Sequence, residues 1–327
     1  MGSRVCFLII LLAGMSSSGL AQQACSAVEV PVGVINAGGE SFRGLTAQDF
    51  ITSKGTIVKS IAYDNGPRRV LFVVDTSSKL SSNTHTAVAE LVRSLIDASR
   101  PEDSLALITA RGPGSAVKFG EDRAGLVRAL LPEGGADHKK EGVLDAMMEG
   151  IEWFSGQQPG DAIVLIAADL DGNHKANAKT VAKAAADHHL RVFGLALGPV
   201  ITQSTVAGGS MTSTTSQGLA YAKPATGDVL VQQGDEHFFP LVTNGGGLLL
   251  AVVNGSMDQS FNMSEPRMQE QVRYKAKQLY GMITVFYRAQ IESPPSHHQD
   301  WVLDVNESVR KHLPAMFVLY PRELGPC

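Results

Sequence analysis

The sequence predicts an α/β protein whose central sheet is mostly parallel and covered by helices on both faces. Apolar, β-branched runs such as residues 69–75 and 162–168 are typical of strands that are buried on both sides. Between these runs, apolar residues recur at helical spacing. The alternation extends from about residue 67 to residue 284, and it favours parallel strands joined by crossover helices.

The composition excludes some classes of function. The 327 residues suffice for one large domain or two small ones, and 44% of them are hydrophobic. The net charge is only −4 and no basic block occurs, which argues against a nucleic-acid-binding surface. Gly194 and Gly198 lack the spacing of a phosphate-binding loop, so a nucleotide-dependent enzyme is disfavoured as well.

The first 21 residues have the pattern of a secretory signal peptide. Arg4 precedes the apolar run 5–12, and small residues follow up to Ala21, after which we expect cleavage. The run is too short to cross a membrane as an ordinary helix; a retained signal anchor is the alternative. We therefore expect a secreted or periplasmic protein whose mature chain has no transmembrane segment.

Cleavage would remove Cys6 and leave Cys25 and Cys327 at opposite ends of the mature chain. These two cysteines could pair in an oxidising compartment. Whether their Cα atoms come within bonding distance is left open by the sequence.

Short strands and turns begin the mature chain. We expect strands at 28–35 and 57–62, with a turn at Gly38-Gly39 and a single helical turn within 45–50 between them. Asn65-Gly66-Pro67 then ends the segment.

Each helix of the α/β block is predicted from its apolar stripe. Asn83 is the expected cap of a helix that presents Val88, Leu91, Val92, Leu95 and Ile96 on one face. Further helices are expected around 126–131, 143–151, 176–188 and 237–242, and a last one is capped by Ser264, with Pro266 in its first turn. The strands between them are expected at 104–110, 116–119, 162–168, 191–197 and 248–253.

Two regions depart from this alternation. Residues 202–218 are rich in Ser, Thr and Gly without periodicity, and we expect a flexible surface loop there. After residue 285 the chain returns to strands, expected at 286–291, 301–305 and 316–320.

The order of elements suggests four segments. Residues 1–21 are the signal peptide, and residues 67–284 form the α/β domain. The terminal segments 22–66 and 285–327 are expected to pair with each other into a small β module. The alternative is that both tails lie on the α/β core as separate hairpins.

Acidic and hydroxyl residues follow two of the predicted core strands. Asp75 and Ser77 come at the end of the strand at 69–75, and Asp169 and Asp171 follow the strand at 162–168. This arrangement resembles the metal-ion-dependent adhesion site of von Willebrand factor type A (VWA) domains, whose first loop reads Asp-x-Ser-x-Ser. The resemblance implies a doubly wound, Rossmann-like sheet with one antiparallel edge strand.

Three further motifs are similar to those of secreted bacterial VWFA-related domain proteins. They are Gly44-Leu45-Thr46-Ala47-Gln48-Asp49-Phe50, the strand entry Pro67-Arg68-Arg69, and the turn Asn244-Gly245-Gly246. The resemblance covers nearly the whole mature chain; the order of elements is fairly specific, whereas each motif is short.

The resemblance also implies a metal and a partner. A hard divalent cation such as Mg²⁺ or Mn²⁺ takes oxygen ligands that converge from separate loops. Here these ligands would be Asp75, Ser77 and one of Asp169 and Asp171. A vacant coordination position would then accept a carboxylate from a protein partner.

The sequence departs from the family pattern at two positions. Lys79 stands where the second serine is expected, and an ammonium group cannot ligate a metal. Where a threonine of the second loop is expected, the sequence has Lys139-Lys140-Glu141, and Glu141 is a candidate substitute ligand. The site is therefore partly degenerate.

These observations predict an exported, non-enzymatic VWA-domain protein that mediates protein–protein interaction or adhesion. The alternative is a structural or assembly module whose degenerate site holds no metal. A subtilisin-like serine hydrolase built from Asp75, His85 and Ser210 is remote, because ten positions between Asp75 and His85 leave no room for the intervening strand. Ser210 should also open an apolar helix, yet Thr and Ser residues follow it.

Overall fold

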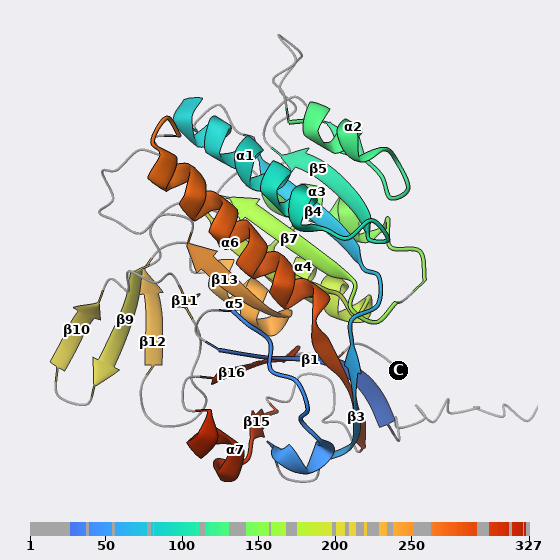
Figure 1. Ribbon diagram of the computed structural model, residues 1–327, viewed down its shortest axis with the longest axis vertical. Coiled ribbons are helices and arrows are strands. Elements are labelled where there is room, and N and C mark those ends of the chain that lie inside the picture. The colour runs from blue at the N-terminus through green and yellow to red at the C-terminus, as the bar shows by residue number, and fades with distance from the viewer. Residues whose placement is uncertain are drawn as a thin grey trace, which may run out of the picture.

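A seven-stranded sheet of order β11-β13-β8-β7-β4-β5-β6 forms the centre of the protein (Figure 1). Its strands are β4 (Arg69–Asp75), β5 (Ser104–Ala110), β6 (Ala116–Val117), β7 (Ala162–Ala167), β8 (Arg191–Ala196), β11 (Leu219–Ala220) and β13 (Gly246–Ala251). The five inner strands are parallel, whereas β6 and β11 run antiparallel at the two edges. The predicted fold class, a mostly parallel α/β sheet, is confirmed.

The computed structural model describes the chain over residues 27–36, 39–53, 56–76, 80, 82–110, 115–130, 142–156, 158–167, 175–197, 201–206, 209–213, 219–220, 229–233, 238–251, 263–292, 301–313, 316–322 and 324. The predicted signal peptide, Cys25 and Cys327 lie outside these residues.

Helices cover both faces of the central sheet. Helices α1 (Ser82–Ala98), α2 (Arg123–Arg128) and α6 (Pro266–Thr284) lie on one face, and α3 (Val143–Ile151), α4 (Ala178–Asp187) and α5 (Phe238–Asn244) lie on the other. Along β4, Val70 and Phe72 pack on the side of α1 and α6, whereas Leu71 and Val73 pack on the side of α3. Because both faces are covered, β4 is continuously apolar from Val70 to Val74.

Two helices do not begin at their predicted caps. Helix α1 starts at Ser82, so Asn83 lies inside it. Helix α6 has Glu265 as its N-cap and Pro266 as its first residue, in place of the predicted cap Ser264. A proline disfavours helical geometry in the residue before it, and Glu265 is accordingly extended, with φ −82° and ψ 122°.

The prediction of a loop at 202–218 is wrong over much of its length. Strands β9 (Ile201–Val206) and β10 (Gly209–Ser213) pair antiparallel, and β12 (Val229–Gln233) pairs with the other edge of β9. The three strands form a separate small sheet beside the main one (Figure 1). No apolar alternation marks them in the sequence, but β-branched threonine and valine favour extended backbone.

Strands from the two ends of the chain form a second sheet, of order β16-β1-β14-β3. Its members are β1 (Ala27–Asn36), β3 (Ile57–Asp64), β14 (Phe286–Glu292) and β16 (Met316–Leu319), all paired antiparallel. Nearby, the 3₁₀ turn η1 (Ala47–Asp49) leads into β2 (Phe50–Thr52), which pairs with β15 (Leu303–Val305), and α7 (Glu307–His312) follows. We call these elements the β module. Strand β1 lies between the two C-terminal strands β16 and β14.

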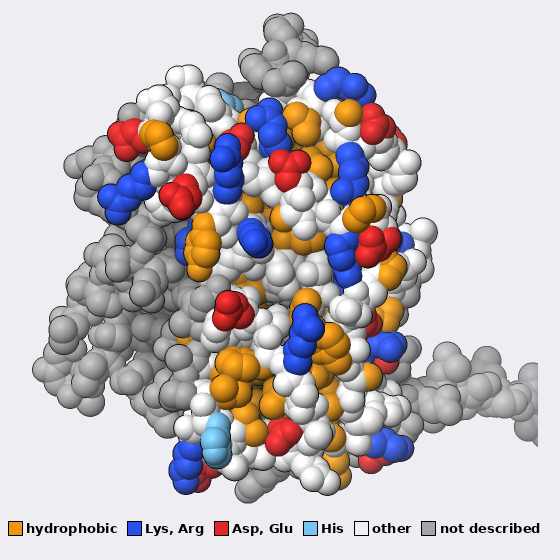
Figure 2. All heavy atoms as spheres, viewed as in Figure 1, with side chains coloured by type: hydrophobic (Ala, Val, Ile, Leu, Met, Phe, Trp, Pro, Cys, Tyr) orange, Lys and Arg blue, Asp and Glu red, His pale blue; other side chains and the backbone are white. Residues whose placement is uncertain are grey.

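The β module has a hydrophobic core of its own around Trp301 and Tyr287. The Trp301 indole donates to the carbonyl of Pro321 at 3.0 Å and meets the ring of Tyr320 edge-on, with 4.9 Å between centroids. Some apolar surface stays outside: Ile57 on β3 is 58% exposed. Figure 2 shows apolar side chains gathered on the lower part of this face, where Figure 1 places the β module.

Buried arginines join the β module to the amino edge of the main sheet. Arg191, the first residue of β8, is fully buried and donates to the carbonyls of Ile283, Met282 (3.5 Å) and Gly160 (3.4 Å). Its guanidinium carbon lies 4.3 Å from the centroid of the Phe286 ring, at the start of β14. Burial, with a further contribution from the Arg68 charge, lowers the pKa of Arg191 to about 9, so the group is still protonated at neutral pH.

Arg68 completes this junction from the start of β4. Its guanidinium carbon lies 4.4 Å from the same Phe286 ring, and it donates to the Thr284 carbonyl at 3.2 Å. The two arginines thus place positive charge at the last carbonyls of α6, where the helix dipole is negative. Gly160 has to be glycine here, because its φ is +87° and a Cβ would lie 2.5 Å from Phe286.

A buried carboxylate stands beside this junction. Asp103 accepts hydrogen bonds from the backbone N–H groups of Arg68 (2.8 Å) and Arg100 (3.0 Å) and from the Tyr280 hydroxyl (2.7 Å). Burial by itself would raise the pKa of Asp103, but these bonds and the Arg100 side chain outweigh it. The pKa of Asp103 therefore lies below its ordinary value of 3.8.

We predict that Arg191→Met lowers the free energy of unfolding by about 3 kcal/mol, because the α6 carbonyls lose buried donors. Urea denaturation at pH 7 measures this change. Arg128→Met is the control: the Arg128 side chain is 71% exposed, so its loss should change the value by less than about 0.5 kcal/mol. Equal stability of Arg191→Met and the unchanged chain would refute the assigned role of Arg191.

We predict that Asp103→Asn is less stable than the unchanged chain at pH 7, and that the difference shrinks below about pH 4. A carboxylate whose folded-state pKa is depressed stabilises the fold above its unfolded-state pKa, and this stabilisation is lost as the pH falls through the folded-state pKa. Urea denaturation at pH 7 and pH 3 measures both values. The exposed Asp97→Asn is the control. A difference that does not depend on pH would contradict the assigned charge state.

Candidate functional site

The candidate site lies at the carboxyl edge of the main sheet. Asp75 is the last residue of β4, which pairs with β5 on one side and β7 on the other. The chain leaves β4, β5, β7 and β8 at this edge and enters α1, α3 and α4 near it (Figure 1). Ligands of open α/β sheets bind in the crevice outside these strand ends.

Asp75 is fully buried, with 0% of its surface exposed. From its place at a strand end we expect this side chain on an outward-facing rim, and the structure buries it instead. The burial follows from the interior position of β4, because β5 and β7 flank its end. Asp75 is opposite Ala110, the last residue of β5. A buried carboxylate is retained where hydrogen bonds, an ion pair or a metal compensate its lost hydration.

The residue after Asp75 fixes the direction of the chain as it leaves the strand. Thr76 donates both its backbone N–H (3.0 Å) and its hydroxyl (3.1 Å) to the carbonyl of Ala110. Beyond Ala110, the loop that leaves β5 is closed at its base: Ser115 N–H donates to the Thr109 hydroxyl at 2.9 Å, and Thr109 N–H donates to the Ser115 carbonyl at 3.0 Å. The contacts of Thr76 with Ala110 therefore join the end of β4 to the end of β5.

A second anchor involves Asp145, in the first turn of α3. Its carboxylate accepts the backbone N–H of Ala176 at 2.7 Å and that of Lys175 at 3.0 Å. This contact ties the start of α3 to the segment that follows the β7 loop and leads into α4. Asn177 then caps α4 by accepting the N–H of Thr180 at 2.9 Å. These hydrogen bonds thus hold the start of α3 against the segment that leads into α4.

Of the predicted metal ligands, only Asp75 is among the described residues. Ser77, Glu141, Asp169 and Asp171 lie outside them, as does Lys79. Within the part of the chain that the structure describes, no group of three or more His, Cys, Asp or Glu side chains could hold a metal ion. Asp75 itself fits a hard cation, because it supplies carboxylate oxygens at the correct edge of the sheet. The described residues provide one of the predicted ligands and the framework for the loops that carry the others.

The roles of Thr76 and Asp145 are not evident from the sequence. Both are recognisable only as types: a hydroxyl after a strand and an acid in the first turn of a helix. Their acceptor and donor partners lie 30 or more positions away in the chain, so no local pattern identifies them.

His85 and Ser210 do not lie in the elements that a subtilisin-like hydrolase mechanism requires. His85 lies in the first turns of α1, and Ser210 lies in β10, paired with Thr205 of β9. A subtilisin-like nucleophile would open a helix, and Ser210 is in a strand instead.

No protein-family model matches the chain, and no curated protein matches it. Solved structures are similar to parts of it. The conserved hypothetical protein BatB from Bacteroides thetaiotaomicron is 18% identical, with a TM-score of 0.39, over 63% of this chain and 97% of that one. An aerotolerance-related membrane protein from Bacteroides fragilis is 16% identical, with a TM-score of 0.40, over 63% and 98%.

Proximal thread matrix protein 1 from the mussel byssus, solved with a zinc-occupied MIDAS motif, is 10% identical. Its TM-score is 0.43, over 71% of this chain and 50% of that one. Similarities at this level carry no information about the ligands of this chain, and its fold class rests on its own strand order.

Proposed function

We propose that this chain is an exported, non-enzymatic VWA-type protein that binds a protein partner at the carboxyl edge of its main sheet. The observation that carries the proposal is the position of Asp75. This carboxylate ends β4, an interior strand of a doubly wound sheet, at the edge where such sheets bind their ligands.

The adjacent loops support the same assignment. Thr76 anchors the first loop to the end of β5, and Asp145 anchors the start of α3 to the segment before α4. Asp169 and Asp171 follow β7, the direct neighbour of β4. A rigid base beneath several loops suits recognition, because it reduces the entropy lost on binding.

We further propose that a divalent cation, Mg²⁺ or Mn²⁺, contributes to binding. Asp75, Ser77 and Asp169 would hold it, with Asp171 and Glu141 as further candidates. All five offer the oxygen ligands that these cations require. When bound, the cation would accept a carboxylate of the partner at a vacant coordination position.

A second candidate is a structural module that works without metal, and Lys79 favours it. Lys79 stands where the family pattern has a serine, and its ammonium group would bring positive charge next to Asp75. A lysine that neutralises the acid would replace the cation in holding the loops.

Export rests on the signal-like pattern of residues 1–21. In the residues that the structure describes, no helix combines the length and apolar character needed to span a bilayer. We propose a secreted or periplasmic location on the basis of the sequence pattern.

We predict saturable binding of Mg²⁺ or Mn²⁺ to the chain in a calorimetric titration, and its loss in Asp75→Asn. Lys79→Ser restores the family pattern and removes a positive charge, so it should tighten binding by about tenfold. Asp97→Asn, an exposed acid on α1, is the control and should bind as the unchanged chain does. Binding by Lys79→Ser alone would favour the metal-free module, and no binding by any variant would refute the metal site.

We predict that the immobilised chain captures a protein from the exported fraction, and that Asp75→Asn captures less of it at equal load. If the cation contributes, a chelator has the same effect as Asp75→Asn on the unchanged chain. Near-native melting of Asp75→Asn, checked by circular dichroism, separates loss of binding from loss of folding. Capture that is insensitive to both the substitution and the chelator would place the binding surface elsewhere.

A further inference from the structure

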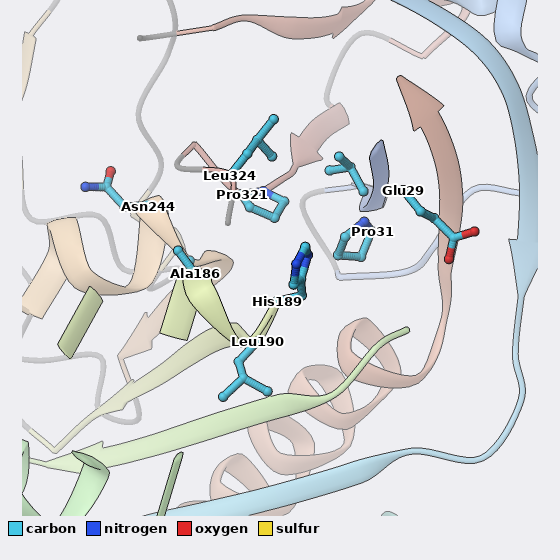
Figure 3. A pocket seen from close by; sticks show the side chains of 10 residues that line it. Glu29, Pro31, Ala186, His189, Leu190, Asn244, Pro321 and Leu324 are labelled. Carbon is cyan, nitrogen blue, oxygen red and sulfur yellow. The ribbon is translucent and has the colours of Figure 1, made fainter. Parts of the chain in front are cut away.

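Two cavities in the surface differ in what they can hold. The cavity beside the start of β1, which Pro31, His189 and Leu324 line in Figure 3, has a volume of about 20 Å³. That is room for about one water molecule. A groove of about 530 Å³ lies between the C-terminal halves of α1 and α6, with Asp97 and Lys277 among its lining residues. This groove is open to solvent, so part of another molecule can enter it.

Gly281 of α6 lines this groove, and the fold itself does not require glycine there. Apart from the backbone of its own helix, a Cβ at this position would meet no atom within 4 Å. Its φ is not positive either. Glycine inside a helix is less favourable than alanine, and one use of glycine is to let another group approach the backbone closely. The surface above Gly281 is therefore an open place on the helix.

Tyr274 projects from the same face of α6. Its exposed fraction is 56%, which is high for a large apolar side chain. Tyr274 lies seven positions before Gly281 in the same helix. Seven residues make about two helical turns, so the two positions share one stripe and lie about 10 Å apart along the axis. Helix α6 thus presents an aromatic ring and an open place at a fixed separation.

Two opposite charges accompany this stripe. Lys277 lies between Tyr274 and Gly281 on α6, and Asp97 lines the groove from α1. Both side chains are exposed, and among the described residues neither forms an ion pair. By contrast, Arg273 of the same helix binds Glu90 of α1 at 3.2 Å.

The wider surface carries charges of both signs. Figure 2 shows basic and acidic side chains interspersed over the face where Figure 1 places α1 and α6. A surface of mixed sign is suited to a partner that carries the same mixture. A second copy of the chain meets this requirement, because each copy supplies one unpaired lysine and one unpaired aspartate in this groove.

We propose that this face binds a second copy of the chain, in a twofold-symmetric dimer whose two α6 helices pack antiparallel. A contact centred between Lys277 and Gln278 leaves Tyr274 and Gly281 equally far from the centre. The ring of Tyr274 in each copy then lies over Gly281 of the other. Twofold symmetry repeats each contact, so one ring and one open place per copy are sufficient.

The same symmetry pairs the charges. A twofold axis that crosses both α6 helices within the interface keeps the two α1 helices on one side of the contact. Lys277 of each copy, which lines the groove next to α1, then faces Asp97 on α1 of the other copy. Such complementary pairs fix the register of an interface and disfavour other partners.

This dimer leaves the candidate functional site accessible. Arg100 also lines the groove, and its backbone N–H donates to Asp103, which lies directly before β5. The groove is therefore near the amino edge of the main sheet, whereas Asp75 ends β4 at the carboxyl edge. A dimer would present two carboxyl edges, so a partner with two epitopes would bind more tightly than to one copy.

The first test measures self-association of the full chain by analytical ultracentrifugation, with reductant present so that disulfide-linked species do not contribute. We expect a reversible dimer whose share rises with concentration over about a hundredfold range. Tyr274→Ser removes the ring and Gly281→Gln fills the place above the helix, so each should weaken association by about tenfold or more. Ile57→Ser is the matched control: Ile57 is 58% exposed in the β module, and its loss should leave association unchanged.

The second test uses charge reversal to show that the pairing is between copies. Lys277→Asp and Asp97→Lys should each weaken self-association, because like charges then face each other. An equimolar mixture of these two variants should dimerise again, since each copy carries the complement of the other. Melting followed by circular dichroism checks the folding of every variant, and Gly281→Gln should melt no lower than the unchanged chain because glutamine favours helix.

Three results would overturn the proposal. The first is a chain that stays monomeric at every concentration, which would leave this face to a different protein. The second is a dimer that Ile57→Ser dissociates, or one that survives both Tyr274→Ser and Gly281→Gln. The third is a mixture of Lys277→Asp and Asp97→Lys that remains monomeric although both variants are folded.

Discussion

Two buried guanidinium groups on one phenylalanine ring fix how the parts of this protein fit together. Arg191 and Arg68 both contact Phe286, and both donate to the last carbonyls of α6. A buried charge requires compensating acceptors, and here the C-terminus of α6 supplies several of them. The contacts of these two arginines therefore hold the end of α6 and the start of β14 against the amino edge of the main sheet.

This junction determines which edge of the sheet is available for binding. The β module occupies the amino edge, where β4 and β8 begin with Arg69 and Arg191. The carboxyl edge remains for the loops after β4, β5 and β7. The charged groups at the two edges differ accordingly. Arg68 and Arg191 lie at the amino edge against carbonyls of α6, whereas the buried Asp75 lies at the carboxyl end of β4.

The proposed site combines a rigid base with substituted ligands. Thr76 and Asp145 hold the loops by hydrogen bonds to backbone groups, which do not depend on the identity of a bound ion. In the sequence, Lys79 and Glu141 stand where the family pattern has hydroxyl residues. A scaffold of this kind can keep its shape while the chemistry at its edge changes, because the anchoring contacts and the proposed ligands belong to different residues.

The fold class and most of the core follow from the amino-acid sequence alone. The run from Val70 to Val74 had to be covered on both faces, and the stripe on α1 from Val88 to Ile96 had to face a core, because apolar periodicity records burial. The sequence also places Asp75 at a strand end. The strands that flank β1, the contacts of Arg191 and the N–H groups that donate to Asp145 depend on the folded arrangement. These pairings join residues far apart in the chain, and a hydrophobic pattern indicates that a residue is buried without indicating its partner.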